Sequence, residues 1–354
     1  MKRILKIIGM ILLIVVLAVA IFVGYLTATE YCPGEREAAE TGGETGRESS
    51  CETGQPLKIL SWNTGYAGLD ASADFFMDGG SMVKPVSQEQ VEANIAAIAD
   101  VICQGNYDLC LLQEVDRKSA RTGKIDELSR YSAETALGWA YAANYRCRFV
   151  PFPFPPIGAV ESGLATMSNL RVAGNAERIS LPCPFDWPVR AANLKRCLLV
   201  SRYAVAGTEQ ELVVVNLHLE AYDDGAGKEA QAQALMELLQ REYEKGNYVI
   251  AGGDFNQSFP GTLTAYPIID PDTWTPGVVE ESKIPEGWSI VYDDETPSCR
   301  LLNRPYDPDA ENTQYYVIDG FIVSPNVEVA AAQTLDLHFA NSDHNPVQLT
   351  VNLQ

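Results

Sequence analysis

Histidine is scarce in this chain: only three of its 354 residues are histidines, at positions 218, 338 and 344. Cysteine occurs eight times, but never as C-x-x-C and never with a histidine at zinc-site spacing, which argues against a structural zinc site. A lone histidine is more often a satisfied core residue than a catalytic one. His218 and His344 nevertheless both stand beside expected strand ends among polar residues, and this shared setting indicates a role in chemistry.

Basic residues are also few. The chain has 26 Lys and Arg against 47 Asp and Glu, which gives a formal net charge of −21. Proteins that bind nucleic acid tightly gain most of their affinity by neutralising phosphates with Lys and Arg. The acidic balance therefore argues against a tight DNA binder, but it is compatible with a small phosphorylated substrate.

Only one long hydrophobic run is present. Residues 4–26 are apolar apart from Lys6 and two glycines, and Met1, Lys2 and Arg3 precede them. About 20 apolar residues cross a bilayer as a helix, whereas the apolar part of a cleaved signal usually has about 7–15. We favour an uncleaved single-pass anchor over residues 1–26 rather than a cleaved signal. The preceding basic residues predict a cytoplasmic N-terminus, with the rest of the chain outside the cell membrane.

Residues 27–56 contain almost no aliphatic side chains. Seven Glu and two Arg alternate there with Gly, Ser and Thr. A segment of this kind cannot bury enough apolar surface to fold, so we expect a disordered acidic tether. Cys32 and Cys51 lie in this segment and could form a disulfide outside the cell, which the sequence does not decide.

Strand-like and helix-like segments alternate throughout residues 57–354, which is the pattern of one folded domain. We expect this domain to be monomeric. The apolar spacing predicts helices over 87–103 and 227–245, the first with Ser87 as its N-cap. Mixed hairpins with two crossover helices predict α and β layers packed face to face. The expected strands are residues 58–63, 108–115, 164–168, 196–205, 211–219, 248–252, 315–323 and 347–353.

Polar side chains recur where these strands end or begin. The positions are Asn63, Glu114, His218, Asp254 with Asn256, Asp319, and Asp343 with His344. Because a sheet brings strand ends together, six segments can deliver these side chains to one rim. Carboxylates and amides without cysteine favour a hard divalent cation such as Mg²⁺ or Mn²⁺ over zinc. A metal with carboxylates and imidazoles suits phosphoester hydrolysis, since the ion activates water and an imidazole moves a proton.

Each of these positions also has a plainer interpretation. Asn63 before Thr-Gly, and Asp254 after two glycines, could belong to turns. Glu114 could be a strand-end carboxylate that faces solvent, and Asp319 before a glycine could mark a turn. It is improbable that all of these interpretations hold together, in this order.

The ordered motifs resemble the endonuclease/exonuclease/phosphatase superfamily, which includes DNase I-like nucleases, inositol polyphosphate 5-phosphatases and neutral sphingomyelinases. The resemblance covers about residues 57–354 and implies a four-layer α/β/β/α sandwich with the site on one edge. The motifs are Ser61-Trp62-Asn63, Leu112-Gln113-Glu114-Val115, Asn216-Leu217-His218-Leu219, Gly252-Gly253-Asp254-Phe255-Asn256, Ile318-Asp319-Gly320-Phe321 and Ser342-Asp343-His344-Asn345-Pro346-Val347.

The resemblance implies a metal set and a catalytic set. Glu114 is then the principal metal ligand, helped by Asn63, with Asp343 as a further candidate. Asp254 orients or deprotonates the attacking water, and Asn256 holds a phosphate oxygen.

The same resemblance gives roles to the histidines. Asp319 pairs with His344 and fixes its tautomer, and the pair acts as a base or as a phosphate clamp. His218 stabilises the transition state or protonates the leaving oxygen. The sequence does not decide which group is the base.

Substrate identity depends on the loops. Arg300 is a candidate for contacting substrate phosphate, although an ordinary ion pair with one of the many acids is an equal alternative. The stretch 149–157, with three Phe among four Pro, could rest on a membrane, line a pocket or pack onto the core. We therefore expect an extracellular metal-dependent phosphodiesterase or phosphatase acting on a small or lipid phosphoester. The alternatives are a nuclease of the same fold and an inactive binding module.

Overall fold

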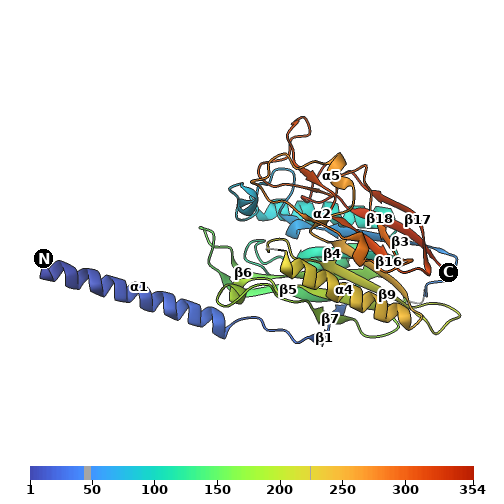
Figure 1. Ribbon diagram of the computed structural model, residues 1–354, viewed down its shortest axis with the longest axis horizontal. Coiled ribbons are helices and arrows are strands. Elements are labelled where there is room, and N and C mark those ends of the chain that lie inside the picture. Colours follow the sequence, from blue (N-terminus) through green and yellow to red (C-terminus); the bar gives the residue numbers. More distant parts are fainter. Residues whose placement is uncertain (44–48, 224) are drawn as a thin grey trace.

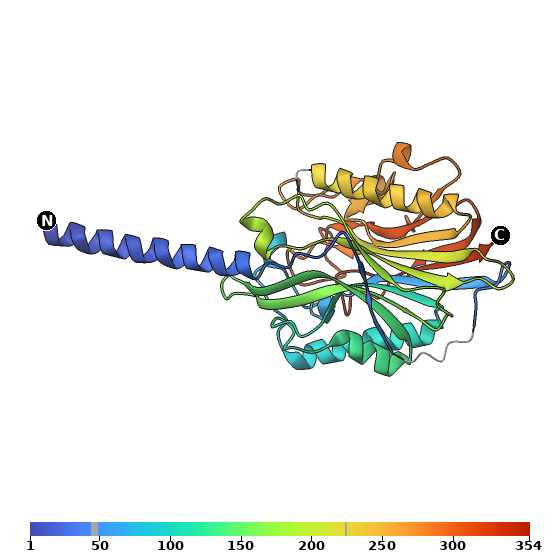
Figure 2. The same cartoon turned by 90° about the horizontal axis from the view of Figure 1, so that it is seen from below.

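Two seven-stranded β-sheets packed face to face form the centre of the protein. The computed structural model describes residues 1–43, 49–223 and 225–354. Helices cover both outer faces of the sheet pair (Figures 1 and 2). The expected four-layer α/β/β/α sandwich is therefore confirmed.

The first sheet carries two of the motif strands side by side, β9 and β10, which run parallel. Across this sheet the strands are β1 (Arg36–Ala38), β7 (Glu177–Ser180), β8 (Cys197–Ala204), β9 (Glu211–His218), β10 (Tyr248–Asp254), β16 (Asp319–Val323) and β13 (Ser289–Val291).

The second sheet carries the motif strands β3 and β4, also parallel neighbours. Across this sheet the strands are β17 (Val327–Thr334), β18 (Val347–Leu353), β3 (Pro56–Asn63), β4 (Leu109–Asp116), β6 (Gly158–Ser168), β5 (Gly138–Val150) and β2 (Glu40–Gly42).

Alternation along the strands separates the inner core from the outer layers. Ile59 and Leu111 point between the two sheets, whereas Leu60 and Leu112 pack against helix α2 (Gln88–Gly105) on the outside. The expected N-cap of α2 is present, since the Ser87 hydroxyl accepts a hydrogen bond from the backbone N–H of Gln90 at 3.1 Å. Helix α3 (Glu127–Thr135) joins α2 on this face, and α4 (Ala226–Glu244) covers the first sheet.

One polar bridge joins the two sheets directly beneath the motif residues. Gln113 Nε2 donates to Asn216 Oδ1 at 2.9 Å, and Asn216 Nδ2 donates to the carbonyls of Leu112 and Ala165 at 3.1 and 3.0 Å. Both amides are fully buried, so breaking the hydrogen bonds between them would be costly. The bridge fixes how the sheets lie relative to each other. Gln113 immediately precedes Glu114 in the chain, and Asn216 lies two residues before His218.

The shorter elements lie in the loops that connect these layers. They are η1 (Gly65–Ala67), η2 (Phe76–Asp78), η3 (Val189–Ala192), η4 (Glu281–Lys283), α5 (Thr262–Ala265), β11 (Gln257–Ser258), β12 (Gly277–Val278), β14 (Cys299–Arg300) and β15 (Tyr315–Tyr316).

The N-terminal run forms one long helix, α1 (Lys2–Ala28), which projects from the body (Figure 1). An 18-residue stretch of this helix has a mean hydropathy of 3.2 and is not buried against the body. Within the described chain, α1 is the one helix long and apolar enough to cross a membrane, although a signal sequence can have the same length and composition.

The expectation of a disordered tether over residues 27–56 differs from the structure. β1 pairs with β7, and β2 pairs with β5, so this segment extends one edge of each sheet. Edge strands recruit an extended partner through backbone hydrogen bonds, which do not require apolar side chains. Residues 44–48 lie outside the described residues. Cys32 is exposed and Cys51 buried, and all eight cysteines are free.

Candidate active site

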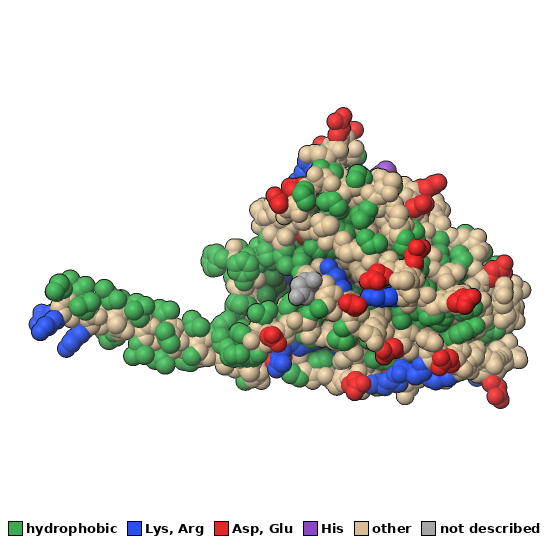
Figure 3. All heavy atoms as spheres, in the orientation of Figure 1, with side chains coloured by type: hydrophobic (Ala, Val, Ile, Leu, Met, Phe, Trp, Pro, Cys, Tyr) green, Lys and Arg blue, Asp and Glu red, His purple; other side chains and the backbone are tan. Residues whose placement is uncertain are grey.

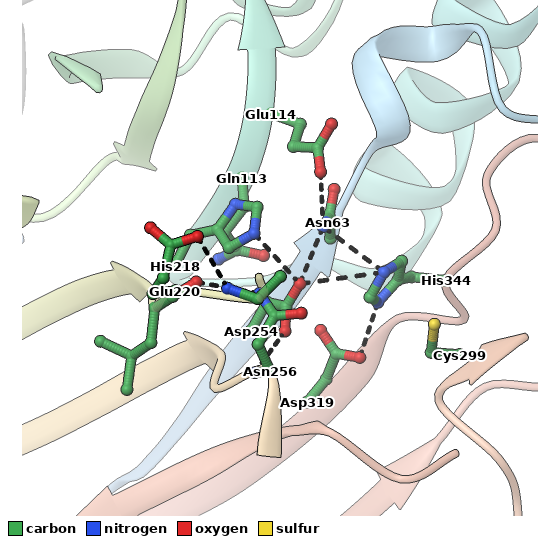
Figure 4. Close-up of polar contacts among 12 residues, drawn as sticks. Asn63, Gln113, Glu114, His218, Glu220, Asp254, Asn256, Cys299, Asp319 and His344 are labelled. Atoms are coloured by element: carbon green, nitrogen blue, oxygen red, sulfur yellow. Dashed lines mark hydrogen bonds and ion pairs between the residues drawn. The ribbon is translucent and has the colours of Figure 1, made fainter. Parts of the chain in front are cut away.

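The strand-end residues meet at one rim of the sheet pair, around a cavity of about 1020 Å³. Figure 4 shows their side chains turned toward one another from strands of both sheets. The cavity is lined there by Asn63, Glu114, His218, Asp254, Asn256, Asp343 and His344. Asp319 lies behind His344.

Strand register brings three of these residues together. Asp254 is the register partner of His218 on the parallel strand β9 and of Asp319 on the antiparallel strand β16. Gly253 makes the close strand approach possible, because a Cβ there would lie 2.0 Å from the Leu217 carbonyl oxygen. His218 Nε2 consequently lies 3.4 Å from Asp254 Oδ2.

Glu114 reaches the cavity through an irregularity in β4. The pairing of β4 with β6 shifts register between Leu112 and Val115, and Glu114 has a φ of 56°, in the left-handed region. Such a conformation costs about 1–3 kcal/mol for a residue other than glycine and is found most often at functional sites. The bulge re-aims the carboxylate toward Asn63, whose Nδ2 lies 3.2 Å from Glu114 Oε1.

Asn63 is the hydrogen-bonding centre of the cluster. Its Nδ2 also donates to Asp254 Oδ2 at 3.0 Å, while its Oδ1 accepts the Gly65 amide at 3.1 Å. In this orientation the amide nitrogen, not the oxygen, faces the carboxylates. Direct metal coordination by Asn63 would require its carboxamide to turn over.

His344 is held on both sides. Its Nδ1 donates to Asp319 Oδ2 at 2.8 Å, and that oxygen also accepts the Ser298 hydroxyl at 2.8 Å. The backbone carbonyl of His344 accepts the Trp62 indole N–H at 2.8 Å. The expected Asp319–His344 pair is therefore present, and it points His344 Nε2 toward Asp254 Oδ2, 3.8 Å away.

The pKa values of the two buried imidazoles are shifted in opposite directions. Burial, together with the charges of Arg196 and His344, lowers the pKa of His218 well below its ordinary value. Burial also opposes protonation of His344, but Asp319 outweighs it, so the pKa of His344 is raised well above its ordinary value. His218 is thus neutral and His344 cationic near neutral pH.

The acids share this crowded environment. Burial and the neighbouring Asp319 raise the pKa of Asp254 to about 7. Burial, with a contribution from Glu114, raises the pKa of Asp343 to about 6. Carboxylates gathered in this way repel one another, and a bound cation would relieve that repulsion.

The donor set fits a hard divalent cation. Glu114 and Asp343 offer carboxylate oxygens at the cavity, which Mg²⁺ and Mn²⁺ prefer as ligands. A second arrangement uses Asp254, Asp319 and His344, each of which offers a ligand atom within 4.8 Å of the others. In that second group, however, His344 is already paired with Asp319, so Glu114 and Asp343 are the less committed ligands.

Asn256 lies at the cavity with a backbone partner of its own. Its Nδ2 donates to the Leu219 carbonyl at 2.9 Å, and its backbone N–H donates to Asp254 Oδ1 at 2.8 Å. The second hydrogen on Asn256 Nδ2 remains for another acceptor. His338, by contrast, is exposed and lies 3.3 Å from Asp336.

Arg196 and Arg300 both line the cavity, and of these two only Arg300 was expected there. Arg300 lines the cavity, but it donates to the backbone carbonyls of Asp70, Ala73 and Arg304 at 2.8, 3.2 and 3.1 Å. Its main contacts therefore hold loops together. Arg196, which was not a sequence candidate, lines the cavity with only 5% of its surface exposed.

Arg196 has spare hydrogen-bonding capacity. Its Nε lies 3.5 Å from Glu220 Oε2, and its Nη1 has no hydrogen-bond partner among the described residues. The sequence signal was weak, since Arg196 merely begins an apolar strand. Its position beside His218 comes from the pairing of β8 with β9.

Comparisons with known proteins agree with this geometry. The sequence profile described as the Endonuclease/Exonuclease/phosphatase family matches residues 60–344. A solved endonuclease/exonuclease/phosphatase from Beutenbergia cavernae DSM 12333 is 18% identical, with a TM-score of 0.60, and the match covers 84% of this chain and 72% of that one. No curated protein matches the sequence.

Two further structures have the same fold. A family protein from Leptotrichia buccalis C-1013-b is 14% identical, with a TM-score of 0.54, over 84% of this chain and 100% of that one. A conserved protein of unknown function from Enterococcus faecalis V583 is 18% identical, with a TM-score of 0.52, over the same two shares. At these identities the likeness concerns the fold alone.

Proposed function

The chain belongs to the endonuclease/exonuclease/phosphatase family, and from this membership we propose that it is a divalent-metal-dependent phosphoester hydrolase. The observation that carries the proposal is the convergence of Glu114, Asp254, His218 and the Asp319–His344 pair on one buried rim. No member of that set is replaced by an inert residue, which argues against an inactive binding module.

The roles follow from contacts and charge. Mg²⁺ or Mn²⁺ held by Glu114 and Asp343 would neutralise phosphate oxygens and lower the pKa of a bound water. Asp254 would orient the attacking water and take up its proton; its carboxylate lies at the centre of the site, 3.4 Å from His218 and 3.8 Å from His344.

The remaining groups stabilise charge. His344, kept cationic and oriented by Asp319, faces the phosphate and offsets the negative charge that develops in the transition state. The spare side-chain amide hydrogen of Asn256 adds a donor at the cavity, and Arg196 in the cavity wall adds positive charge. His218, neutral and 5% exposed, holds Asp254 in place through the 3.4 Å contact and is a candidate proton donor to the leaving oxygen.

We further propose that α1 anchors the protein in the cell membrane and that the hydrolase domain lies outside the cell. The basic residues Lys2, Arg3 and Lys6 at the start of α1 support this orientation. A nuclease of the same fold is the alternative, and the net charge of −21 argues against it.

Hydrolysis assays on the full-length chain in detergent test the proposal. We expect bis-p-nitrophenyl phosphate to be hydrolysed with Mg²⁺ or Mn²⁺ and not with EDTA. Plasmid DNA, inositol phosphates and phospholipids complete the substrate panel. Absence of turnover of every substrate under both metals would refute the proposal, and rapid nicking of plasmid DNA would favour the nuclease alternative.

A further inference from the structure

The cavity at the active site continues into an apolar groove that reaches the base of α1. Beyond the polar residues already described, its walls include Val23 and Leu26 of α1 and Phe75, Phe76 and Phe152 of two loops. The rings of Phe76 and Phe152 lie 6.1 Å apart, nearly perpendicular, so these loops meet at the groove. One continuous cavity thus has a charged end and a hydrophobic end.

The last turns of α1 pack against the body rather than swing free. Phe22 contacts Phe149 edge to face at 6.1 Å, and Leu26 is 8% exposed, packed against the end of β5. Thr27 Oγ1 accepts the Trp187 indole N–H at 2.9 Å. These contacts fix which end of the body faces the membrane if α1 spans it.

Salt bridges reinforce the same junction. Glu30, just after α1, lies 3.2 Å from Arg190 and 3.1 Å from Lys195. Both cations belong to the segment that lies beneath α1, so the junction is held by charge as well as by apolar packing.

Hydrophobic side chains are exposed around this end of the body. Phe152, Phe154, Trp187 and Val189 are 71%, 92%, 54% and 60% exposed. Figure 3 shows hydrophobic side chains gathered where α1 leaves the body, beside the hollow of the groove. Exposed clusters of this kind mark membrane or protein contacts, and aromatic residues favour the membrane–water interface.

The cations inside the cavity are too few and too committed to bind a highly charged soluble substrate. Arg121 is paired with Asp116 at 2.7 Å, and Arg300 is bound to backbone carbonyls. That leaves Arg196, itself next to Glu220, and His344, which is paired with Asp319. A polyphosphorylated sugar or a nucleic acid would need more positive charge than these walls provide.

We propose that the substrate is a phosphodiester lipid of the membrane that α1 spans, with an acyl chain in the apolar groove and the phosphodiester at Glu114 and His344. This inference rests on the proposed hydrolase function and names its substrate class. The apolar groove is needed because an acyl chain that leaves the bilayer would otherwise expose its methylene groups to water, which is unfavourable for each of them. The groove opens at the membrane end, so the lipid need not cross water to reach the site.

The reaction consumes one water. Its oxygen bonds to phosphorus, one P–O ester bond of the lipid breaks, and the released alcohol oxygen takes up a proton. The phosphodiester becomes a phosphomonoester and an alcohol.

The first test compares a lipid with a soluble substrate for the same enzyme. The full-length chain is reconstituted into vesicles of equimolar phosphatidylcholine, phosphatidylglycerol and sphingomyelin with Mn²⁺ or Mg²⁺. Phosphorus NMR follows conversion of lipid phosphodiester into phosphomonoester, and bis-p-nitrophenyl phosphate is assayed in parallel. We expect Phe152→Asp to lower the ratio of lipid to soluble turnover at least tenfold. Ile269→Asp, an exposed apolar residue outside the cavity, should leave the ratio unchanged.

The outcomes separate the two levels of the proposal. If the wild type hydrolyses neither substrate, the hydrolase function itself fails. If it hydrolyses only the soluble phosphodiester, or if Phe152→Asp lowers both activities equally, the hydrolase stands and the lipid inference fails. Because Phe152 is exposed, its replacement should not unfold the protein, which a melting curve checks.

A second test needs no turnover. In vesicles that contain phosphatidylcholine brominated on its acyl chains, we expect Trp187 fluorescence to be quenched. Trp187→Phe should remove most of the quenching, whereas Trp288→Phe, away from the groove, should not. Equal quenching in the wild type and Trp187→Phe would mean that this end of the body does not touch the bilayer.

Discussion

Asp254 and His218 are register partners at the ends of neighbouring parallel strands, and their side chains approach to 3.4 Å. Asp254 is also the partner of Asp319 across the antiparallel neighbour. Backbone pairing alone therefore assembles the centre of the site, and His344 and Glu114 join it from the second sheet and its loops.

Glu114→Gln should remove most metal binding and most activity. A neutral amide oxygen binds a hard divalent cation far more weakly than a carboxylate does, so we expect turnover to fall roughly 100-fold or more. Titration calorimetry with Mn²⁺ measures the affinity, and bis-p-nitrophenyl phosphate measures turnover. Glu89→Gln, on the exposed side of α2, is the matched control. Near-wild-type affinity in Glu114→Gln would show that the ion is held elsewhere.

Asp319→Asn should lower activity through His344, because Asp319 holds His344 and does not itself line the cavity. The amide cannot stabilise an imidazolium, so we expect turnover to fall about 10²–10⁴-fold and the pKa of His344 to fall. Because the chain has three histidines, the His344 ring proton can be followed by NMR. Ser298→Ala keeps the carboxylate and should cost much less. An unchanged His344 titration in Asp319→Asn would contradict the pairing.

Arg196 and Arg300 should respond differently to substitution by lysine. Arg196→Lys should raise KM about tenfold with little change in melting temperature, because Arg196 lines the cavity and has Glu220 as its ion-pair partner. Arg300→Lys should chiefly lower the melting temperature, because it loses buried bonds to three carbonyls worth about 1 kcal/mol each. A raised KM in Arg300→Lys together with a lowered melting temperature in Arg196→Lys would indicate that Arg300 is the arginine that binds substrate.

Glu242 should make the fold sensitive to acid. Burial raises its pKa, but hydrogen bonds from Arg202 and Lys245 outweigh burial and lower it to about 2. A depressed carboxylate pKa contributes stability that is complete above the unfolded value, near 4.5. That stability is lost as pH falls toward 2.

Urea unfolding between pH 5 and 2 measures this contribution. We expect the wild type to lose about 2 kcal/mol more stability over this range than Glu242→Gln, which has no proton to gain. Parallel loss in the two proteins would show that Glu242 is not responsible for the acid sensitivity.

Much of the site could be predicted because its information is local. Strand periodicity located β3, β4, β9 and β10, and the polar residue that ends each strand marked the rim. The N-cap at Ser87 and the long apolar helix are likewise properties of short segments. Helix α3 and the long strand β5 were missed, since their burial depends on partners distant in the sequence.

Other features depend on contacts that no local pattern specifies. The left-handed backbone of Glu114 follows from a register shift against β6, and the order in residues 36–42 follows from the open edges of both sheets. Arg300 was the better candidate from its position between motifs, yet its Nη2 donates to carbonyls more than 220 residues away in the chain. Arg196 lines the cavity as well.

The sequence by itself determined the layers, the order of the motifs and the residue types at the rim, because hydrophobic period and strand-end chemistry are set by neighbouring residues. Only the tertiary structure decided that the last turns of α1, the Phe76 loop and the Phe152 loop close around one groove that leads to Glu114 and His344. Such a groove arises from packing between segments that are far apart in the chain, and its shape depends on how side chains from all of them fit together.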